Sequence, residues 1–180
     1  MIRHLRSIRT KLSIYLMLPV LAACGTTMPE LKPVEHVDLS RFMGDWYVIA
    51  NIPTFLEKSA HNAVETYELN EDGTIATTFT FRDGSLDGKQ KTYTPKGFVT
   101  DHPSNAVWGM RFIWPIKADY RIIYLDDSYS TTIIGRNKRD YVWLMARRPE
   151  LDAATYDELL ELIGSVGYDL TEVRRVPQKW

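Results

Sequence analysis

The sequence has one cysteine, no acidic residue before Glu30 and no long apolar run near its beginning. Because Cys24 is the single cysteine among 180 residues, no disulfide can form within the chain, and packing and hydrogen bonding must keep it rigid. The apolar run at residues 12–23 would rise only about 18 Å as a helix, less than a hydrocarbon core of about 30 Å. These absences argue against a disulfide scaffold and against a membrane-spanning helix at this position.

Signatures of several enzyme classes are also missing. The chain has no G-x-S-x-G, no H-E-x-x-H and no glycine-rich phosphate loop. The histidines after residue 24 are too far apart in sequence to define a metal site. Residues 83–88 imitate the start of a calcium loop, but Thr94 stands where an EF-hand has glutamate, and strand patterns replace the flanking helices. We therefore predict a protein that is not an enzyme, with no metal and no cofactor.

The first residues have the pattern of an export signal. Four basic residues precede the apolar run and small residues close it: Arg3, Arg6, Arg9 and Lys11, then Ala22 and Ala23. An uncleaved anchor helix is the alternative. Residues 21–25, Leu-Ala-Ala-Cys-Gly, resemble the bacterial lipoprotein box. This resemblance implies that residues 1–23 are a signal peptide and that Cys24 is acylated and anchors the protein in a membrane.

The residues after Cys24 bear on where the protein would sit and what it would bind. Gly25, rather than aspartate, follows the cysteine, and by resemblance to Gram-negative sorting this favours the cell outer membrane, with the domain facing the periplasm. Residues 24–38 are predicted to be a flexible tether. Without residues 1–23 the chain keeps 18 basic and 23 acidic residues, a net charge of −5. This balance argues against a nucleic-acid partner.

Short strand patterns separated by turn residues fill most of the remaining chain. Period-2 alternation and β-branched or aromatic residues predict eight strands, over residues 46–50, 63–69, 74–81, 89–100, 106–113, 119–125, 129–135 and 141–147. Eight strands joined mostly by short loops predict an up-and-down barrel or a sandwich. The period then changes, and residues 153–166 predict an amphipathic helix with Asp152 as N-cap and Gly167 as its stop. Residues 168–173 predict a last short strand.

Three short motifs occur in order along this pattern. Gly44-Asp45-Trp46-Tyr47 opens the first strand, residues 126–129 (Asp-Asp-Ser-Tyr) lie between the sixth and seventh strands, and Arg147 ends the eighth. Together with the following helix, they resemble the lipocalins, in particular the bacterial outer-membrane lipocalins related to apolipoprotein D, over about residues 39–176. Arg148 could take the place of Arg147. The resemblance implies an all-β fold, an eight-stranded antiparallel up-and-down barrel with one C-terminal helix packed outside.

An eight-stranded barrel has room for side chains or one small ligand, and one end must be plugged. Trp46 on the first strand can fill that end, and Arg147 on the neighbouring eighth strand can lie over the indole. By resemblance, the residues of this structural motif are Gly44, Trp46, Asp126, Tyr129 and Arg147. We expect them to serve structure rather than ligand contact.

Alternation along the strands predicts the cavity lining. If Trp46 points inward, Val48 and Ala50 do so too. On the eighth strand, Tyr141, Trp143 and Met145 alternate in step with Arg147 and are predicted to share one face with it. The candidate ligand-binding residues are Val48, Ala50, Phe79, Phe81, Trp108, Met110, Tyr120, Ile122, Tyr124, Tyr141, Trp143 and Met145. Each could instead be ordinary core packing, and a β-bulge would reverse the parity.

Such a cavity suits one fatty chain. We expect a lipid-binding lipocalin that stores or transports single-chain lipids, lysophospholipids or fatty acids such as palmitate, for membrane maintenance. The headgroup would stay at the mouth, where Lys58 and His61 could meet a phosphate or carboxylate if the loop is not simply solvated. The alternatives are a structural lipoprotein with a filled barrel that binds a protein partner, or an esterase or isomerase built on the barrel. The resemblance also allows a homodimer.

Overall fold

The computed structural model describes residues 28–100 and 102–180. Its elements, in chain order, are α1 (Leu39–Phe42), β1 (Gly44–Ile52), β2 (Ala60–Leu69), β3 (Thr74–Asp83), β4 (Gln90–Tyr93), β5 (Lys96–Val99), β6 (Val107–Ile113), β7 (Ile116–Leu125), β8 (Thr131–Gly135), β9 (Val142–Ala146), α2 (Ala153–Ser165), the 3-10 turn η1 (Leu170–Glu172) and β10 (Arg174–Arg175). The predicted signal peptide and Cys24 lie outside the described residues. In the described part of the chain, no helix is both long and apolar enough to cross a membrane.

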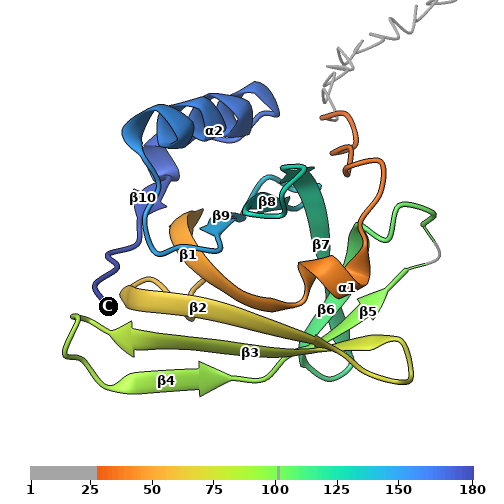
Figure 1. The fold of residues 1–180 in the computed structure, drawn as a ribbon, viewed down its shortest axis with the longest axis horizontal. Coiled ribbons are helices and arrows are strands. Elements are labelled where there is room, and N and C mark those ends of the chain that lie inside the picture. Colours follow the sequence, from red (N-terminus) through yellow and green to blue (C-terminus); the bar gives the residue numbers. More distant parts are fainter. Residues whose placement is uncertain (1–27, 101) are drawn as a thin grey trace, which may run out of the picture.

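The strands form one antiparallel sheet that closes into a barrel (Figure 1). Neighbours follow the order β1-β2-β3-β5-β6-β7-β8-β9, and β9 pairs back with β1, where Val48 lies opposite Met145. β4 and β5 both pair with β3, so together they make one barrel position, interrupted at Thr94 and Pro95. The predicted eight-stranded barrel is confirmed. Closure removes most of the free strand edges through which a sheet would otherwise bind other chains, and among the barrel strands β4, which pairs with β3 alone, keeps one.

Apolar side chains gather in two clusters, one on each side of the barrel wall. The inner cluster lies inside the barrel and includes Trp46, Tyr67, Phe79, Trp108 and Tyr120. The outer cluster lies between the wall and α2, and includes Ile49, Ile133, Leu144, Leu159 and Ile163. The buried residues of both clusters belong to residues 31–176. A chain that starts at Gly25 therefore keeps every residue of both cores.

The helix α2 lies against the outside of the barrel, as the sequence predicts (Figure 1). Its N-cap is Asp152, whose side chain accepts a hydrogen bond from the backbone N–H of Thr155 at 3.0 Å. Gly167 follows with φ +98°, a left-handed conformation that ends helices readily because glycine has no Cβ. The predicted strand over residues 168–173 is wrong: these residues contain η1, and the two residues of β10 come after it and pair with β1.

Two irregularities in strand pairing change which side chains point inward. The register of β1 against β9 shifts between Val48 and Ala50, and that of β7 against β8 shifts between Ile122 and Tyr124. An extra residue at each shift reverses the alternation beyond it. Ala50 and Tyr124, which strict alternation placed in the cavity, therefore belong to the outer cluster under α2.

The segment before α1 is packed rather than free. Leu31 is buried, and its N–H donates to Asn137 Oδ1 at 2.8 Å. The N–H of Val34 donates to the carbonyl of Ile122 at 2.9 Å, and Val37 is fully buried in the inner cluster. The prediction of a flexible tether over residues 24–38 is therefore wrong for residues 28–38, which run along the barrel.

Candidate functional site

One end of the barrel is closed by a tryptophan under an arginine. The guanidinium carbon of Arg147 lies 3.8 Å from the centroid of the fully buried Trp46 ring, a cation–π contact. The same guanidinium donates hydrogen bonds to the carbonyls of Asp45 at 2.8 Å and Met43 at 2.8 Å. Trp46 Nε1 in turn donates to the carbonyl of Phe42 at 2.8 Å. Arg147 thus joins β9 to the chain entering β1.

Two other residues of the predicted structural motif, Gly44 and Tyr129, lie near Arg147 and shape the closed end of the barrel. Gly44 has φ +94°, and a Cβ there would lie 3.4 Å from Arg147 Nη1, so glycine suits both the backbone and the space. Tyr129 accepts a hydrogen bond at its hydroxyl from the N–H of Asp38 at 2.9 Å. Arg148, which the sequence left as an alternative, is exposed at the surface.

Asp126 organises the turn between β7 and β8. Its Oδ1 accepts hydrogen bonds from the N–H groups of Ser130 at 2.7 Å and Thr131 at 2.6 Å. Ser128 and Ser130 donate their hydroxyls to Oδ2. Burial alone would raise the pKa of Asp126, but hydrogen bonds from Ser128, Thr131 and Ser130 outweigh it and hold the pKa at about 2. This carboxylate serves the turn rather than chemistry.

Above the aromatic plug, the barrel holds a cavity of about 580 Å³, within the range of small-molecule sites. Its walls are mostly apolar and include Phe79, Tyr93, Met110, Tyr120 and Trp143. The interruption at Thr94 and Pro95 also lines it. A barrel whose interior is completely filled, one of the alternatives, would have no such space.

The predicted ligand-binding residues divide into three groups. Five line the cavity: Phe79, Met110, Tyr120, Tyr141 and Trp143. Five lie in the inner cluster but outside the cavity lining: Val48, Phe81, Trp108, Ile122 and Met145. The last two, Ala50 and Tyr124, face α2 because of the bulges described above. Contact with a ligand stays a prediction for the first group.

Trp108 illustrates why an inward side chain need not reach the cavity. Its ring stacks on Tyr120, with centroids 5.1 Å apart and planes at 7°. It also meets Phe42 edge-on at 5.5 Å, and Nε1 donates to the carbonyl of Asn105 at 2.7 Å. Trp108 is therefore part of the plug beneath the cavity, and Tyr120 forms the floor above it.

The mouth of the cavity is rimmed by exposed apolar side chains. Phe55 comes from the β1–β2 loop, and Phe112, Ile113 and Ile116 come from the β6–β7 hairpin; all four line the cavity and are 48% to 73% exposed. Trp114, at the tip of the same hairpin, is 78% exposed. Lys58 and His61, the predicted headgroup contacts, are not part of the lining.

The β1–β2 loop is held over the mouth by a buried glutamate. Glu57 is 4% exposed, and its carboxylate accepts hydrogen bonds from Thr54 N–H at 3.0 Å and from Trp143 Nε1 at 3.1 and 3.2 Å. Burial raises the pKa of Glu57, and these hydrogen bonds only partly oppose it. The loop and β9 are thereby joined through one carboxylate.

A second glutamate lies deeper in the cavity. Glu65 is 8% exposed, lines the cavity and accepts a hydrogen bond from the Tyr67 hydroxyl, which lies 2.6 Å from the Tyr120 hydroxyl. Burial raises the pKa of Glu65 to about 7; the Tyr67 hydrogen bond opposes this rise and the charge of Glu57 adds to it. Burial also raises the pKa of Tyr67 and of Tyr120, so both phenols stay protonated.

Sequence reasoning missed both glutamates. Glu65 alternates with Ala63 and Tyr67 along β2, and all three are buried, so the period-2 pattern could have placed it inside. Glu57 lies in a loop and offered no such signal. Among residues 28–100 and 102–180, no three His, Cys, Asp or Glu side chains are grouped so as to hold a metal ion.

Comparison with known proteins assigns the family. A family profile described as "Lipocalin-like domain" matches residues 37–178, which span the barrel and α2. The chain belongs to the lipocalin family. Lipocalins are in general binding and transport proteins for small hydrophobic molecules, and the cavity of this lipocalin has the apolar walls that such molecules need.

Relatives of this lipocalin occur in plants, bacteria and animals. Temperature-induced lipocalin-1 of Arabidopsis thaliana is 30% identical over 162 residues, covering 85% of this chain and 86% of the relative. Outer membrane lipoprotein Blc of Escherichia coli is 26% identical over 171 residues, covering 88% and 90%. Apolipoprotein D of Bos taurus is 29% identical over 146 residues, covering 76% and 75%.

The solved structure of insecticyanin from the tobacco hornworm Manduca sexta superposes with a TM-score of 0.65, covering 82% of this lipocalin and 84% of insecticyanin. Its sequence identity is 16%, so this likeness shows the fold alone.

Proposed function

We propose that this lipocalin binds single-chain lipids, lysophospholipids or fatty acids, and stores or transports them for membrane maintenance. The observation that carries the proposal is the apolar cavity of about 580 Å³ that opens through a rim of exposed apolar side chains. At about 0.8 kcal/mol per buried CH₂, a chain of ~16 carbons supplies roughly 12 kcal/mol before the costs of binding are subtracted. The affinity is set by the part of this gain that exceeds those costs.

The proposal includes a place of action. The Leu-Ala-Ala-Cys-Gly sequence and the similarity to bacterial outer membrane lipoproteins support an acylated Cys24 in the outer membrane, with the barrel facing the periplasm. The exposed rim then lies at the entrance that a lipid leaving a membrane would use. Phe55, Ile113 and Trp114 would contact the bilayer surface and let the lipid pass from the membrane to the cavity with little exposure of its tail to water.

Native mass spectrometry tests this function. The chain from Gly25 would be mixed with a lipid extract of whole bacterial membranes and ionised gently. We expect a bound mass that matches a single-chain lipid, and weaker retention in Trp143→Ala, which removes a large part of the cavity wall. A folded protein that retains no lipid from the extract would contradict the proposal and favour a protein partner instead.

A further inference from the structure

The cavity contains acidic and basic side chains that a site for a fatty-acid tail would not need. Besides tyrosines, the cavity lining contains three acidic side chains and one basic side chain: Glu57, Glu65, Asp119 and Arg136. Asp119 is paired with Arg121, at 3.0 Å from Nε, and accepts the Asn137 N–H at 2.7 Å. Arg136 is paired in turn with Asp140 at 3.3 Å, and its buried Nε has no hydrogen-bond partner among the described residues.

The two glutamates lack such partners. In the described part of the chain, neither Glu57 nor Glu65 lies within ion-pair distance of a lysine, arginine or histidine. The Glu57 carboxylate accepts hydrogen bonds from Trp143 and Thr54. Glu65 accepts only the hydrogen bond from Tyr67 among these residues. A buried carboxylate with so few donors is costly unless something else supplies charge or hydrogen bonds.

A polar side chain diagonal to Glu65 has no hydrogen-bond partner within the part of the chain that the structure describes. Thr77 is 3% exposed and lines the cavity, and its hydroxyl has no hydrogen-bond partner among the described residues. Glu65 on β2 pairs with Phe79 on β3, and Thr77 lies two residues before Phe79 on the same strand. Thr77 is therefore the diagonal neighbour of Glu65. An acceptor and a hydroxyl thus stand close together on the same inner face.

Glu65 and Thr77 lie near the closed end of the barrel, and this position bears on which end of a ligand can reach them. Glu65 pairs across β1–β2 with Trp46, the plug of the closed end, whereas the apolar rim lies at the opposite end, on the β1–β2 loop and the β6–β7 hairpin. Glu65 and Thr77 therefore form a polar spot deep in the cavity, whereas Glu57 lies on the loop over the mouth. A fatty acid bound tail-first would bury its tail against Glu65 and leave its charged headgroup beside Glu57 and the apolar rim.

We propose that Glu65 and Thr77 receive the positively charged or hydrogen-bond-donating end of a single-chain amphiphile, which enters headgroup first and leaves its tail toward the apolar rim. Glu57 adds negative charge above this site. At this deep site long-chain amines and, more weakly, long-chain alcohols are favoured over fatty-acid anions, because ionised Glu65 attracts a cation and repels an anion. This inference rests on the proposed binding of single-chain lipids, and it adds long-chain amines and alcohols to the ligands and ranks them above fatty acids.

Three ligands with the same chain separate headgroup from tail. Dodecylamine, dodecanol and dodecanoate would compete with the fluorescent apolar probe N-phenylnaphthylamine for the chain from Gly25 at pH 8, where Glu65 is mostly ionised. We expect the amine to bind about tenfold or more tightly than the acid, with the alcohol between them. Binding of the acid as tightly as the amine would overturn the inference but leave lipid binding intact. Displacement by none of the three would contradict lipid binding itself, and the inference with it.

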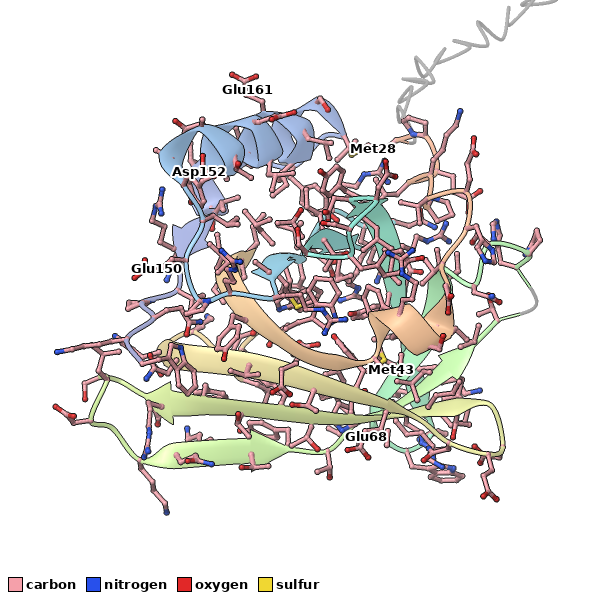
Figure 2. All side chains as sticks on the ribbon, viewed as in Figure 1. Met28, Met43, Glu68, Glu150, Asp152 and Glu161 are labelled. Carbon is pink, nitrogen blue, oxygen red and sulfur yellow. The ribbon has the colours of Figure 1, made fainter. Side chains whose placement is uncertain are left out.

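Matched variants locate the effect. Glu65→Gln should reduce the preference for amine over acid by about tenfold, because a neutral amide attracts a cation far less than a carboxylate does. The control is Glu68→Gln on the same strand, where Glu68 (labelled in Figure 2) is exposed and should leave the preference unchanged. An unchanged preference in a folded Glu65→Gln variant would overturn the inference.

A measurement on the unmodified chain gives an independent test. Glu65 faces Tyr67, Tyr120 and Glu57, and the first two remain neutral in the accessible pH range. Burial raises the pKa of Glu65 to about 7, so protonation below that pH removes the charge that attracts the ligand, while the amine stays protonated. We expect affinity for dodecylamine to fall several-fold from pH 8 to pH 6, and for dodecanol to change little. Equal affinity for the amine at both pH values would overturn the inference.

Discussion

The guanidinium carbon of Arg147 lies 3.8 Å from the centroid of the Trp46 ring, and the same group donates to carbonyls of the chain that leads into β1. Strand closure alone would join β9 to β1 by backbone hydrogen bonds. The arginine adds a side-chain connection at the end where the barrel must be plugged.

Replacing Arg147 tests that connection. Arg147→Lys keeps the charge but loses the planar fork that reaches several carbonyls at once. We expect a loss of about 2–4 kcal/mol in the free energy of unfolding, measured by urea denaturation. Arg148→Lys is the control, because Arg148 is exposed, and should change stability by less than about 0.5 kcal/mol. Equal losses in both variants would show that Arg147 has no special role.

Removing the Asp126 carboxylate should loosen the β7–β8 turn. Asp126→Ala leaves the N–H groups of Ser130 and Thr131 without their acceptor, which should cost about 1–2 kcal/mol after allowance for the turn's exposure to water. The pKa of Asp126 lies at about 2, below its ordinary 3.8. Its contribution is therefore present above about pH 4 and is lost as the pH falls through about 2. Asp127→Ala, at the exposed neighbouring position, should show neither the loss nor this pH dependence.

The pH dependence of stability should have the opposite sign for Glu65. Its pKa rises on folding from an ordinary 4.5 to about 7, so the folded chain holds the proton more tightly than the unfolded chain does. The fold is therefore most stable, as regards this group, below about pH 4.5, and loses up to about 3 kcal/mol as the pH rises through about 7.

Thermal unfolding of Glu65→Gln checks that sign. The neutral amide cannot ionise, so the variant should melt higher than the parent chain at pH 8, by several degrees for a chain of this size, and the gap should close at pH 5. Glu68→Gln should follow the parent at both pH values. A Glu65→Gln variant that melts lower than the parent at pH 8 would mean that the carboxylate is already stabilised in the folded chain.

The exposed tryptophan at the rim should act on lipid uptake rather than on folding. Trp114 is 78% exposed, so Trp114→Ala should leave the melting temperature nearly unchanged. It should slow transfer of a fluorescent single-chain lipid from vesicles to the barrel, because less apolar surface meets the bilayer. Trp180→Ala removes another exposed tryptophan, 68% exposed at the end of the chain and away from the cavity, and should not slow transfer. Equal slowing in both variants would argue against docking through the rim.

Much of this protein is determined locally and can be predicted from the sequence. Period-2 alternation locates the strands and period-3.6 spacing locates α2, because each pattern reflects which side chains one element buries. The order of Gly44, Trp46, Asp126 and Arg147 along these elements predicts the plugged barrel, since each residue type suits the backbone or the contact it makes there. The Cys24 anchor also follows from sequence alone and stays a prediction.

The lining of the cavity depends on contacts between distant elements. The bulge at Ala50 arises where β1 pairs with β9, far away in the sequence, and the bulge at Tyr124 lies in the β7–β8 hairpin; the alternation of residue types signals neither. The same holds for residues 28–38, whose hydrogen bonds reach β7 and the β8–β9 loop. The raised pKa of Glu65 requires the whole barrel, because only closure removes water from β2 and brings Tyr120 and Glu57 toward it. Sequence thus determined the barrel and its plug, and tertiary structure decided the polarity of the space inside.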